Sequence, residues 1–299
     1  MDRRVVLAKP VCLIAAVLGL LCTFTWAAKP DPPATAPQRI DEGQRVFVCG
    51  HSFHVYIAPS LAKLAEEGGL KKHQTAGVQM LGSSEVHQHW NLPDGRNKAK
   101  AALTAGLVDV LTLSPAWGMP DKAIDKFVDL ALSGNPGVRV ILQQSWSAYD
   151  GAGADRIKDV RERDKKTVAD LKPRLDAQRA IFEQQARQIN QRCGKELVFV
   201  APAGQAVLAL RQKIIEGEAP GLQRQSDLFR DALGHGREPV QNLVSYVFFA
   251  CIYQRSPIGM KAFTKAGDDA HNRLDRLLQN IAWETVRSHP CSGVKADAP

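Results

Sequence analysis

Short apolar runs alternate with amphipathic stretches along most of this chain. Each run is five or six residues long, the length of a strand buried on both faces of a sheet. The runs predict five strands, over Arg45–Cys49, Gly77–Leu81, Val108–Leu113, Val138–Leu142 and Leu197–Ala201. Helical periodicity predicts helices between or after them, over Ile57–Glu67, Lys98–Ala105, Asp121–Leu132 and Gly204–Glu216. This alternation implies a parallel sheet covered by helices on both faces.

The connection after the fourth strand is longer than the others. A loop rich in Gly and Asp leads into a polar helix with one apolar stripe, made of Val168, Leu171, Leu175, Phe182, Ala186, Ile189 and Cys193. Gly194 is predicted to end this helix, and Pro173 is predicted to kink or restart it. We expect the stripe to cover the sheet, with dimerisation as the alternative use. Two more helices are predicted, over Pro239–Tyr253 and Asp268–Val286.

The N-terminus has the pattern of a secretory signal peptide. Basic residues precede an apolar run over Val11–Leu21, and the small residues Ala27 and Ala28 offer a cleavage site. The run is shorter than the roughly 20 residues of a membrane span. We therefore expect export to the periplasm or the medium, whereas an uncleaved leader would leave the protein membrane-anchored.

These patterns divide the chain into four parts. Residues 1–28 are the predicted signal peptide, and residues 29–43 are a linker rich in Pro and Ala. Residues 44–288 form the predicted folded domain, with a helical insertion at about 150–194, and residues 289–299 form a tail.

Composition and charge narrow the function classes. With 44% apolar and 23% charged residues, the chain has the profile of a soluble globular protein. The net charge of +8 falls to +6 without residues 1–28, which hold three basic residues and one acidic residue. Basic and acidic residues are interspersed over 155–192, so the basic stripe of a nucleic-acid-binding protein is missing. We expect contact with a membrane only through the leader.

Four cysteines remain outside the leader. They are far apart in the sequence, and Cys49 lies in a predicted apolar strand. Export permits disulfides, and we predict at most one, between Cys193 and Cys291.

The segment Val46–His54 carries the strongest chemical signal. It reads VFVCGHSFH, a strand that ends in Gly-His-Ser and runs into a helix. Ser52 would then lie at the carboxyl end of a parallel strand, where ligand sites form in open α/β sheets. Backbone N–H groups near the following helix can stabilise an oxyanion there. The alternative is that Ser52 caps the helix that begins near Tyr56.

A serine nucleophile needs a base. The best supplier is the loop Asp231-Ala232-Leu233-Gly234-His235. His235 would take the proton from Ser52, and Asp231 would orient the imidazole ring. Asp231 could instead be a residue that caps the loop, and His235 a structural histidine.

These residues resemble the SGNH or GDSL hydrolases, and are most similar to a secreted, planctomycete-type branch of that family. The similar segments are Val46–His54, His89–Pro115, Phe199–Arg211 and Leu228–Gly259. The resemblance implies a three-layer α/β/α sandwich with a flavodoxin-like parallel sheet of five strands. It also implies ester hydrolysis through an acyl-enzyme, with no cofactor.

The resemblance further implies an oxyanion hole formed by the N–H groups of Ser52 and Gly82. The family's third donor, an asparagine after the third strand, has no counterpart here. Ser114 or Gln144 could supply that donor. The family usually spaces Asp three residues before His, whereas Asp231 is four residues before His235.

Other polar and aromatic side chains follow strand ends. His51, His54, His87 and His89 raise the alternative of a zinc site, but their spacing matches no recognised ligand pattern. We therefore predict substrate-facing or hydrogen-bonding roles for these four histidines, with His51 and His54 as the candidates for substrate binding, and no metal. Trp90, Trp117 and Trp146 could form a platform for a sugar ring or pack within loops.

The sequence thus predicts an exported serine esterase that removes acetyl or similar acyl groups, with carbohydrate esters as the favoured substrates. Two alternatives stay open. One is a carbohydrate-binding or cell-surface module with weakened catalysis, because the oxyanion asparagine is missing. The other is a histidine-dependent metal hydrolase.

Overall fold

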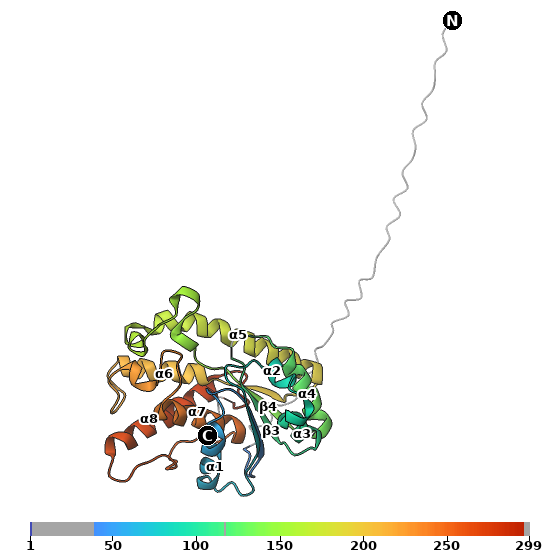
Figure 1. The fold of residues 1–299 in the computed structure, drawn as a ribbon, viewed down its shortest axis with the longest axis horizontal. Coiled ribbons are helices and arrows are strands. Elements are labelled where there is room, and N and C mark those ends of the chain that lie inside the picture. The colour runs from blue at the N-terminus through green and yellow to red at the C-terminus, as the bar shows by residue number, and fades with distance from the viewer. Residues whose placement is uncertain (2–38, 117, 296–299) are drawn as a thin grey trace. The chain divides into compact units, whose positions relative to one another are not determined.

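The computed structural model describes Met1, residues 39–116 and residues 118–295 (Figure 1). The predicted signal peptide beyond Met1 and residues 29–38 of the linker lie outside the described residues. Residues 296–299 of the predicted tail also lie outside them.

The core of the domain is one parallel sheet of five strands in the order β2-β1-β3-β4-β5. The strands are β1 (Arg45–Gly50), β2 (Gln74–Met80), β3 (Val110–Leu113), β4 (Arg139–Gln143) and β5 (Val198–Ala201). All five predicted strands are confirmed. β2 begins three residues before its predicted start, because Gln74 and Thr75 lie on the exposed part of an edge strand and leave no apolar signal. The strand order reverses between β1 and β3, which is where open sheets form ligand sites.

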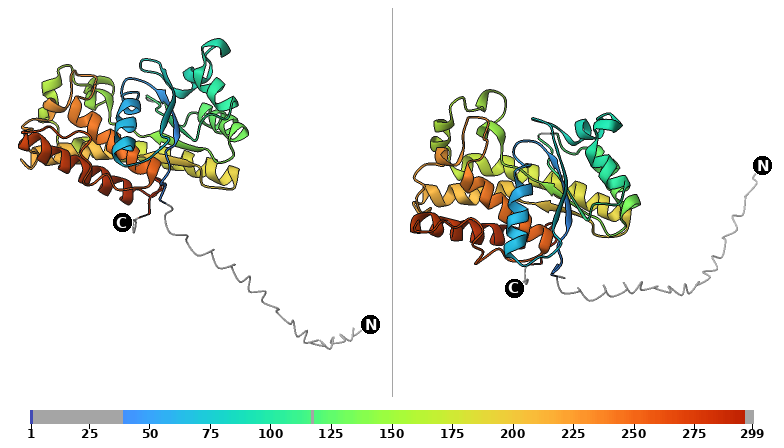
Figure 2. Two further views of the ribbon diagram at one scale, coloured as in Figure 1. Left: turned by 90° about the horizontal axis from the view of Figure 1, so that it is seen from below. Right: turned by 60° about the horizontal axis from the view of Figure 1, so that its bottom comes forward.

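Helices cover both faces of this sheet (Figures 1 and 2). Successive side chains of a strand point to opposite faces. Val46 and Val48 therefore join one apolar core, and Phe47 and Cys49 join the other. The first core is closed by α1 (Ile57–Glu67), α6 (Ala203–Ile215), α7 (Glu238–Tyr253) and α8 (Asp269–Ser288). The second is closed by α2 (Val86–Trp90), α3 (Lys98–Thr104), α4 (Ala123–Gly134) and α5 (Val168–Cys193). The predicted three-layer α/β/α fold is thus confirmed.

The predicted long helix is α5, and its apolar stripe packs within the same chain. Phe182, Ala186 and Ile189 are buried in the second core. The helix ends at Gly194, whose φ of +67° is the left-handed conformation that glycine adopts most easily. The predicted new start at Pro173 is wrong, because α5 continues through that residue.

The predicted Cys193–Cys291 disulfide is also wrong. Both thiols are free, as are the other two cysteines of the described residues. Cys291 Sγ lies 3.4 Å from Arg187 Nη1, beside the middle of α5. Cys193 is six residues further along, which is about 9 Å at the rise of an α-helix. The Cys291 thiol thus contacts a side chain of α5 other than Cys193.

An ion pair joins the starts of the neighbouring strands β1 and β3. Arg45 Nη2 donates to Asp109 Oδ1 at 2.6 Å, and Arg45 Nε donates to Oδ2 at 3.0 Å. Burial raises the pKa of Asp109, but its bonds from Arg45 outweigh that effect, so the pKa lies below its usual value.

We expect Asp109→Asn to lower the free energy of unfolding by about 1 kcal/mol at pH 7, because the bidentate ion pair is lost. A carboxyl whose pKa is lower in the folded state stabilises above its unfolded pKa, about 3.9 for Asp. The difference between wild type and variant should therefore shrink as the pH falls below about 4. Urea denaturation of both proteins at several pH values measures this difference in the free energy of unfolding. A difference that grows as the pH falls would contradict a stabilising role for the Asp109 carboxylate.

Among the described residues, no helix is both long and apolar enough to cross a membrane.

Candidate active site

Ser52 lies just beyond β1, at the point where the strand order reverses. A tight turn follows the strand, because the N–H groups of His54 and Val55 both donate to the carbonyl of His51. Helix α1 begins only at Ile57, and its N-cap residue is Tyr56. Ser52 is therefore not the cap of this helix, and its hydroxyl contacts another part of the chain.

That contact is His235. Ser52 Oγ lies 2.9 Å from His235 Nε2, and His235 Nδ1 lies 2.6 Å from Asp231 Oδ2. A carboxylate can only accept, so Nδ1 carries a proton and Nε2 of the neutral ring is free to accept the Ser52 proton. The structure therefore brings the three predicted residues together in the arrangement of a nucleophile, a base and an orienting acid.

The four-residue spacing between Asp231 and His235 is accommodated by the loop. Asp231 Oδ1 accepts bonds from the backbone N–H groups of Gly234, at 2.9 Å, and His235, at 3.1 Å. Gly234 has a φ of +108°, which few other residues adopt. Burial raises the pKa of Asp231, but its bonds from His235 and from the two N–H groups hold it below the usual value. Asp231 is thus fixed as a carboxylate beside the ring.

A small pocket opens beside Ser52. Its cavity volume is about 20 Å³, and its lining residues are His51, Ser52, Phe53, Ser83, Ala116, Ser145, Trp146, Ala148 and Leu233. Phe53 stacks on Trp146 with ring centroids 4.9 Å apart. The rings of Phe53 and His235 pack edge to face, with centroids 5.3 Å apart. The wall next to the candidate nucleophile is therefore largely apolar.

His51 and His54 have different surroundings. His51 lines the pocket, and its Nδ1 accepts from the N–H of Phe53. Burial lowers the pKa of His51 to about 4, against the opposing effect of the Pro115 carbonyl. His54 is fully buried below the pocket, so its predicted contact with substrate is wrong. A strand end predicts the edge of the sheet but not whether a side chain points up or down.

His54 instead belongs to a buried polar network around Gln143, the last residue of β4. Gln143 Nε2 donates to the Phe53 carbonyl at 3.0 Å and to Ser145 Oγ at 2.7 Å. Its Oε1 must then accept from His54 Nδ1, at 2.8 Å. Burial lowers the pKa of His54 to about 3, so the ring is neutral. The network fixes the turn that carries Ser52.

We expect Gln143→Leu to lower the free energy of unfolding by about 2–4 kcal/mol, because it leaves several buried polar groups without partners. Guanidinium denaturation measures the change. Gln212→Leu, at an exposed position on α6, is the matched control and should change stability by less than about 0.5 kcal/mol. Equal effects of the two variants would show that the network contributes nothing.

The predicted oxyanion donors differ in how they lie relative to the pocket. Gly82 follows β2, and its neighbour Ser83 lines the pocket, with a φ of +49°. Ser114 is buried beneath the pocket, and its hydroxyl contacts His51 Nε2 and Gln143 Nε2. The suggested donor Gln144 points away, since its Nε2 donates to Leu175 and Gln178 near α5. Neither residue is therefore in the pocket wall to replace the missing asparagine.

Of the predicted tryptophans, Trp90 and Trp146 line different pockets. Trp146 lines the pocket beside Ser52 but is buried. Trp90 packs against Phe127 at 5.0 Å and lies under Lys100, away from Ser52, so its predicted role in substrate binding is wrong. Trp117 lies outside the described residues.

The histidines at the carboxyl edge of the sheet contact polar groups of the protein. His89, for example, contacts Gln79 through Nδ1 and Ser84 through Nε2. Within the described part of the chain, no group of three or more His, Cys, Asp or Glu residues has the arrangement of a metal site.

Sequence reasoning missed Ser83, Ser145 and Phe53 as lining residues. Ser145 was detectable in part, because Gln143-Gln144-Ser145 is a polar run directly after a buried strand, and such runs gather at the carboxyl edge of the sheet.

Comparison with known proteins bears on the fold. No protein-family model and no curated protein matches the sequence. A solved DUF4886 family protein from Bacteroides uniformis is similar in structure, with 15% identity, a TM-score of 0.51, and coverage of 83% of this chain and 96% of that chain.

Two further solved structures are similar at lower scores. A candidate SGNH hydrolase from Slackia heliotrinireducens has 16% identity and a TM-score of 0.40, over 70% of this chain and 98% of that chain. A candidate GDSL-like lipase from Parabacteroides merdae has 12% identity and a TM-score of 0.40, over 71% and 97%. The likeness to the DUF4886 family protein extends to the fold alone, an all-parallel sheet of order β2-β1-β3-β4-β5 between two helical layers.

Proposed function

We propose that this chain is a serine hydrolase that cleaves ester bonds through an acyl-enzyme at Ser52. The observation that carries the proposal is the continuous set of contacts from Ser52 Oγ to His235 Nε2, at 2.9 Å, and from His235 Nδ1 to Asp231, at 2.6 Å. Both distances are those of hydrogen bonds that a nucleophile and its base need.

The reaction has two halves. Ser52 Oγ attacks the ester carbonyl carbon while its proton passes to His235 Nε2, and the carbonyl oxygen becomes an oxyanion. Collapse of this intermediate breaks the bond to the alcohol, which takes the proton from His235. Water then loses a proton to His235 and attacks the acyl carbon on Ser52. Collapse of this second intermediate breaks the bond to Ser52 Oγ, which takes the proton back from His235, and the carboxylic acid leaves.

The N–H groups of Ser52 and Gly82 are the proposed donors to the oxyanion. Because Ser114 and Gln144 are engaged elsewhere, a third donor would have to come from another lining residue such as Ser83. Loss of one donor typically lowers kcat by about 10²–10³-fold, so we expect a slower enzyme than a three-donor site would give.

The pocket favours short acyl groups. A cavity of about 20 Å³ bounded by Phe53, Trp146 and Leu233 leaves little length for an acyl chain. We therefore propose acetyl or similar esters of an alcohol such as a carbohydrate, met outside the cytoplasm after export through the N-terminal segment. We expect at least about 10-fold higher kcat/KM for p-nitrophenyl acetate than for the octanoate, because extra methylenes would not fit the pocket. A preference for octanoate would contradict the proposed substrate class.

A serine-reactive phosphonate tests the proposed function directly. Wild-type protein should gain one phosphonyl group, located at Ser52 by peptide mass spectrometry, and Ser52→Ala should gain none. The side chains of Ser114 and Gln144 are both turned from the pocket, which favours a second candidate, a binding module of the same fold. No labelling together with equal, background hydrolysis by wild type and Ser52→Ala would support that module and overturn the esterase.

A further inference from the structure

The loop between Asp231 and His235 is held by a separate part of the chain. Three successive carbonyls of this loop each accept a hydrogen bond, and all three donors come from residues 146–163, beyond β4. The pairs are Arg163 Nη2 to the Ala232 carbonyl at 2.7 Å, the Tyr149 N–H to Leu233 at 3.1 Å, and Trp146 Nε1 to Gly234 at 2.9 Å. The loop thus has little freedom to move as long as residues 146–163 stay in place.

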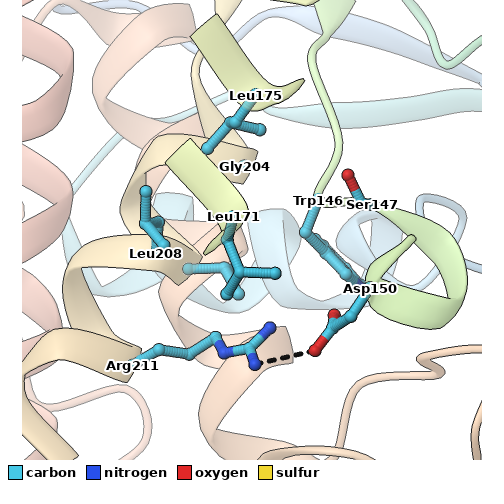
Figure 3. Close-up of a pocket in the computed structure, with 9 residues that line it drawn as sticks. Trp146, Ser147, Asp150, Leu171, Leu175, Gly204, Leu208 and Arg211 are labelled. Atoms are coloured by element: carbon cyan, nitrogen blue, oxygen red, sulfur yellow. Dashed lines mark ion pairs between the residues drawn. The ribbon is translucent and has the colours of Figure 1, made fainter. Parts of the chain in front are cut away.

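Arg163 is the least expected of these donors, because its side chain is completely buried. Its Nη1 forms an ion pair with one oxygen of Asp150, and the other oxygen of Asp150 lies 2.7 Å from Arg211 Nη2. Figure 3 shows the Arg211–Asp150 pair beneath Trp146. The Arg163 guanidinium also lies 4.2 Å from the centre of the Phe229 ring.

The guanidinium geometry suits this position. A planar fork can direct one nitrogen at a carboxylate and the other at a carbonyl at the same time. Gly234 is closely packed against this fork, since a Cβ there would lie 3.0 Å from Arg163 Nη2. Burial lowers the pKa of Arg163, and the negative charges of Asp150 and Asp231 act against that shift. Arg163 therefore links the buried ion pair to the loop that carries the candidate base.

We propose that Arg163 is a positioning residue for His235, acting through the Ala232 carbonyl and anchored by Asp150. The inference rests on the proposed function, because it assigns Arg163 a part in keeping the His235 ring in line with Ser52. Arg163 does not line the pocket, so its loss should affect the chemical step rather than substrate binding.

The variants Arg163→Lys and Arg163→Met separate this role from simple stability. Lysine keeps the buried charge but has one ammonium, which cannot replace both arms of the fork. We expect either variant to lower kcat for p-nitrophenyl acetate by about 10–100-fold with KM within about twofold, as expected for a displaced catalytic group. If the methionine variant does not fold, the lysine variant carries the test.

Arg211→Met is the matched control. Arg211 is the other buried arginine that pairs with Asp150. Its side chain contacts Asp150, Gln225 and, at 3.5 Å, the backbone carbonyl of Arg163, and none of these contacts is with residues 231–235. We expect Arg211→Met to lower the melting temperature at least as much as Arg163→Lys but to keep kcat within about threefold. A kcat equal to that of wild type in Arg163→Lys would overturn the proposal. So would a loss of kcat that parallels the loss of stability in the variants at both Arg163 and Arg211.

A readout without turnover distinguishes this proposal from the proposed function. The proton between His235 Nδ1 and Asp231 should give a downfield proton NMR signal, assigned by its absence in His235→Gln. We expect that signal to shift or broaden in Arg163→Lys and to persist in Arg211→Met. An unchanged signal in Arg163→Lys would contradict the positioning role, whereas absence of Ser52-dependent hydrolysis in wild type would contradict only the proposed function.

Discussion

Ser52→Ala is expected to lower kcat for p-nitrophenyl acetate by about 10⁴-fold or more, because the variant has no oxygen to form the acyl-enzyme. Ser52 Oγ is the only part of its side chain that reaches His235, at 2.9 Å. The fold should be unaffected, since the hydroxyl is half-buried at the pocket and caps no helix. Steady-state kinetics with purified protein measure the effect.

Ser60→Ala provides the control for this substitution. Ser60 lies on the neighbouring helix α1, and its hydroxyl contacts only the Tyr56 carbonyl among the described residues. We expect this variant to keep kcat within about twofold, as surface changes remote from a site usually do. Comparable activity in Ser52→Ala and wild type would mean that Ser52 is not the nucleophile.

His235→Ala is expected to lower kcat by about 10³–10⁵-fold, because the Ser52 proton then has no acceptor within hydrogen-bonding distance. The loss should appear in kcat and in kcat/KM alike, since the ring acts on the reacting proton. The same kinetic assay measures both constants.

His271→Ala is the matched control for the base. His271 is also half-buried, and it contacts the Phe263 carbonyl near the start of α8. It should lower stability slightly and leave kcat within about twofold. If His235→Ala retained most of the wild-type kcat, the contact between His235 and Ser52 would have no catalytic meaning.

The fold was largely predictable because its signals are local. Every strand except β2, an edge strand whose residues are mostly exposed or half-buried, is a largely buried apolar run, and the long helices carry clear periodicity. Helix α2, over Val86–Trp90, was missed because five residues are too few for a periodic pattern to emerge. The disulfide prediction was wrong because spacing in the sequence does not show whether two thiols come within bonding distance.

The candidate triad was predictable for a different reason. Ser52 follows a buried strand directly, and Asp231 and His235 are close in sequence, so each half of the site has a local signal. The side chains that support them have none. Gln143 pairs with His54 across 89 positions, and Arg163 reaches Ala232 across 69. A buried arginine or glutamine reads in the sequence as an ordinary surface residue, so only the structure reveals its role.

The most direct test of the account is rapid quenching of the reaction with p-nitrophenyl acetate in acid, followed by mass spectrometry of the protein and its peptides. Wild-type protein is expected to carry one acetyl group, on Ser52, during turnover. Arg163→Lys should accumulate the same adduct more slowly. Turnover by wild-type protein without an adduct on Ser52, or an equal adduct on Ser52→Ala protein, would contradict the account.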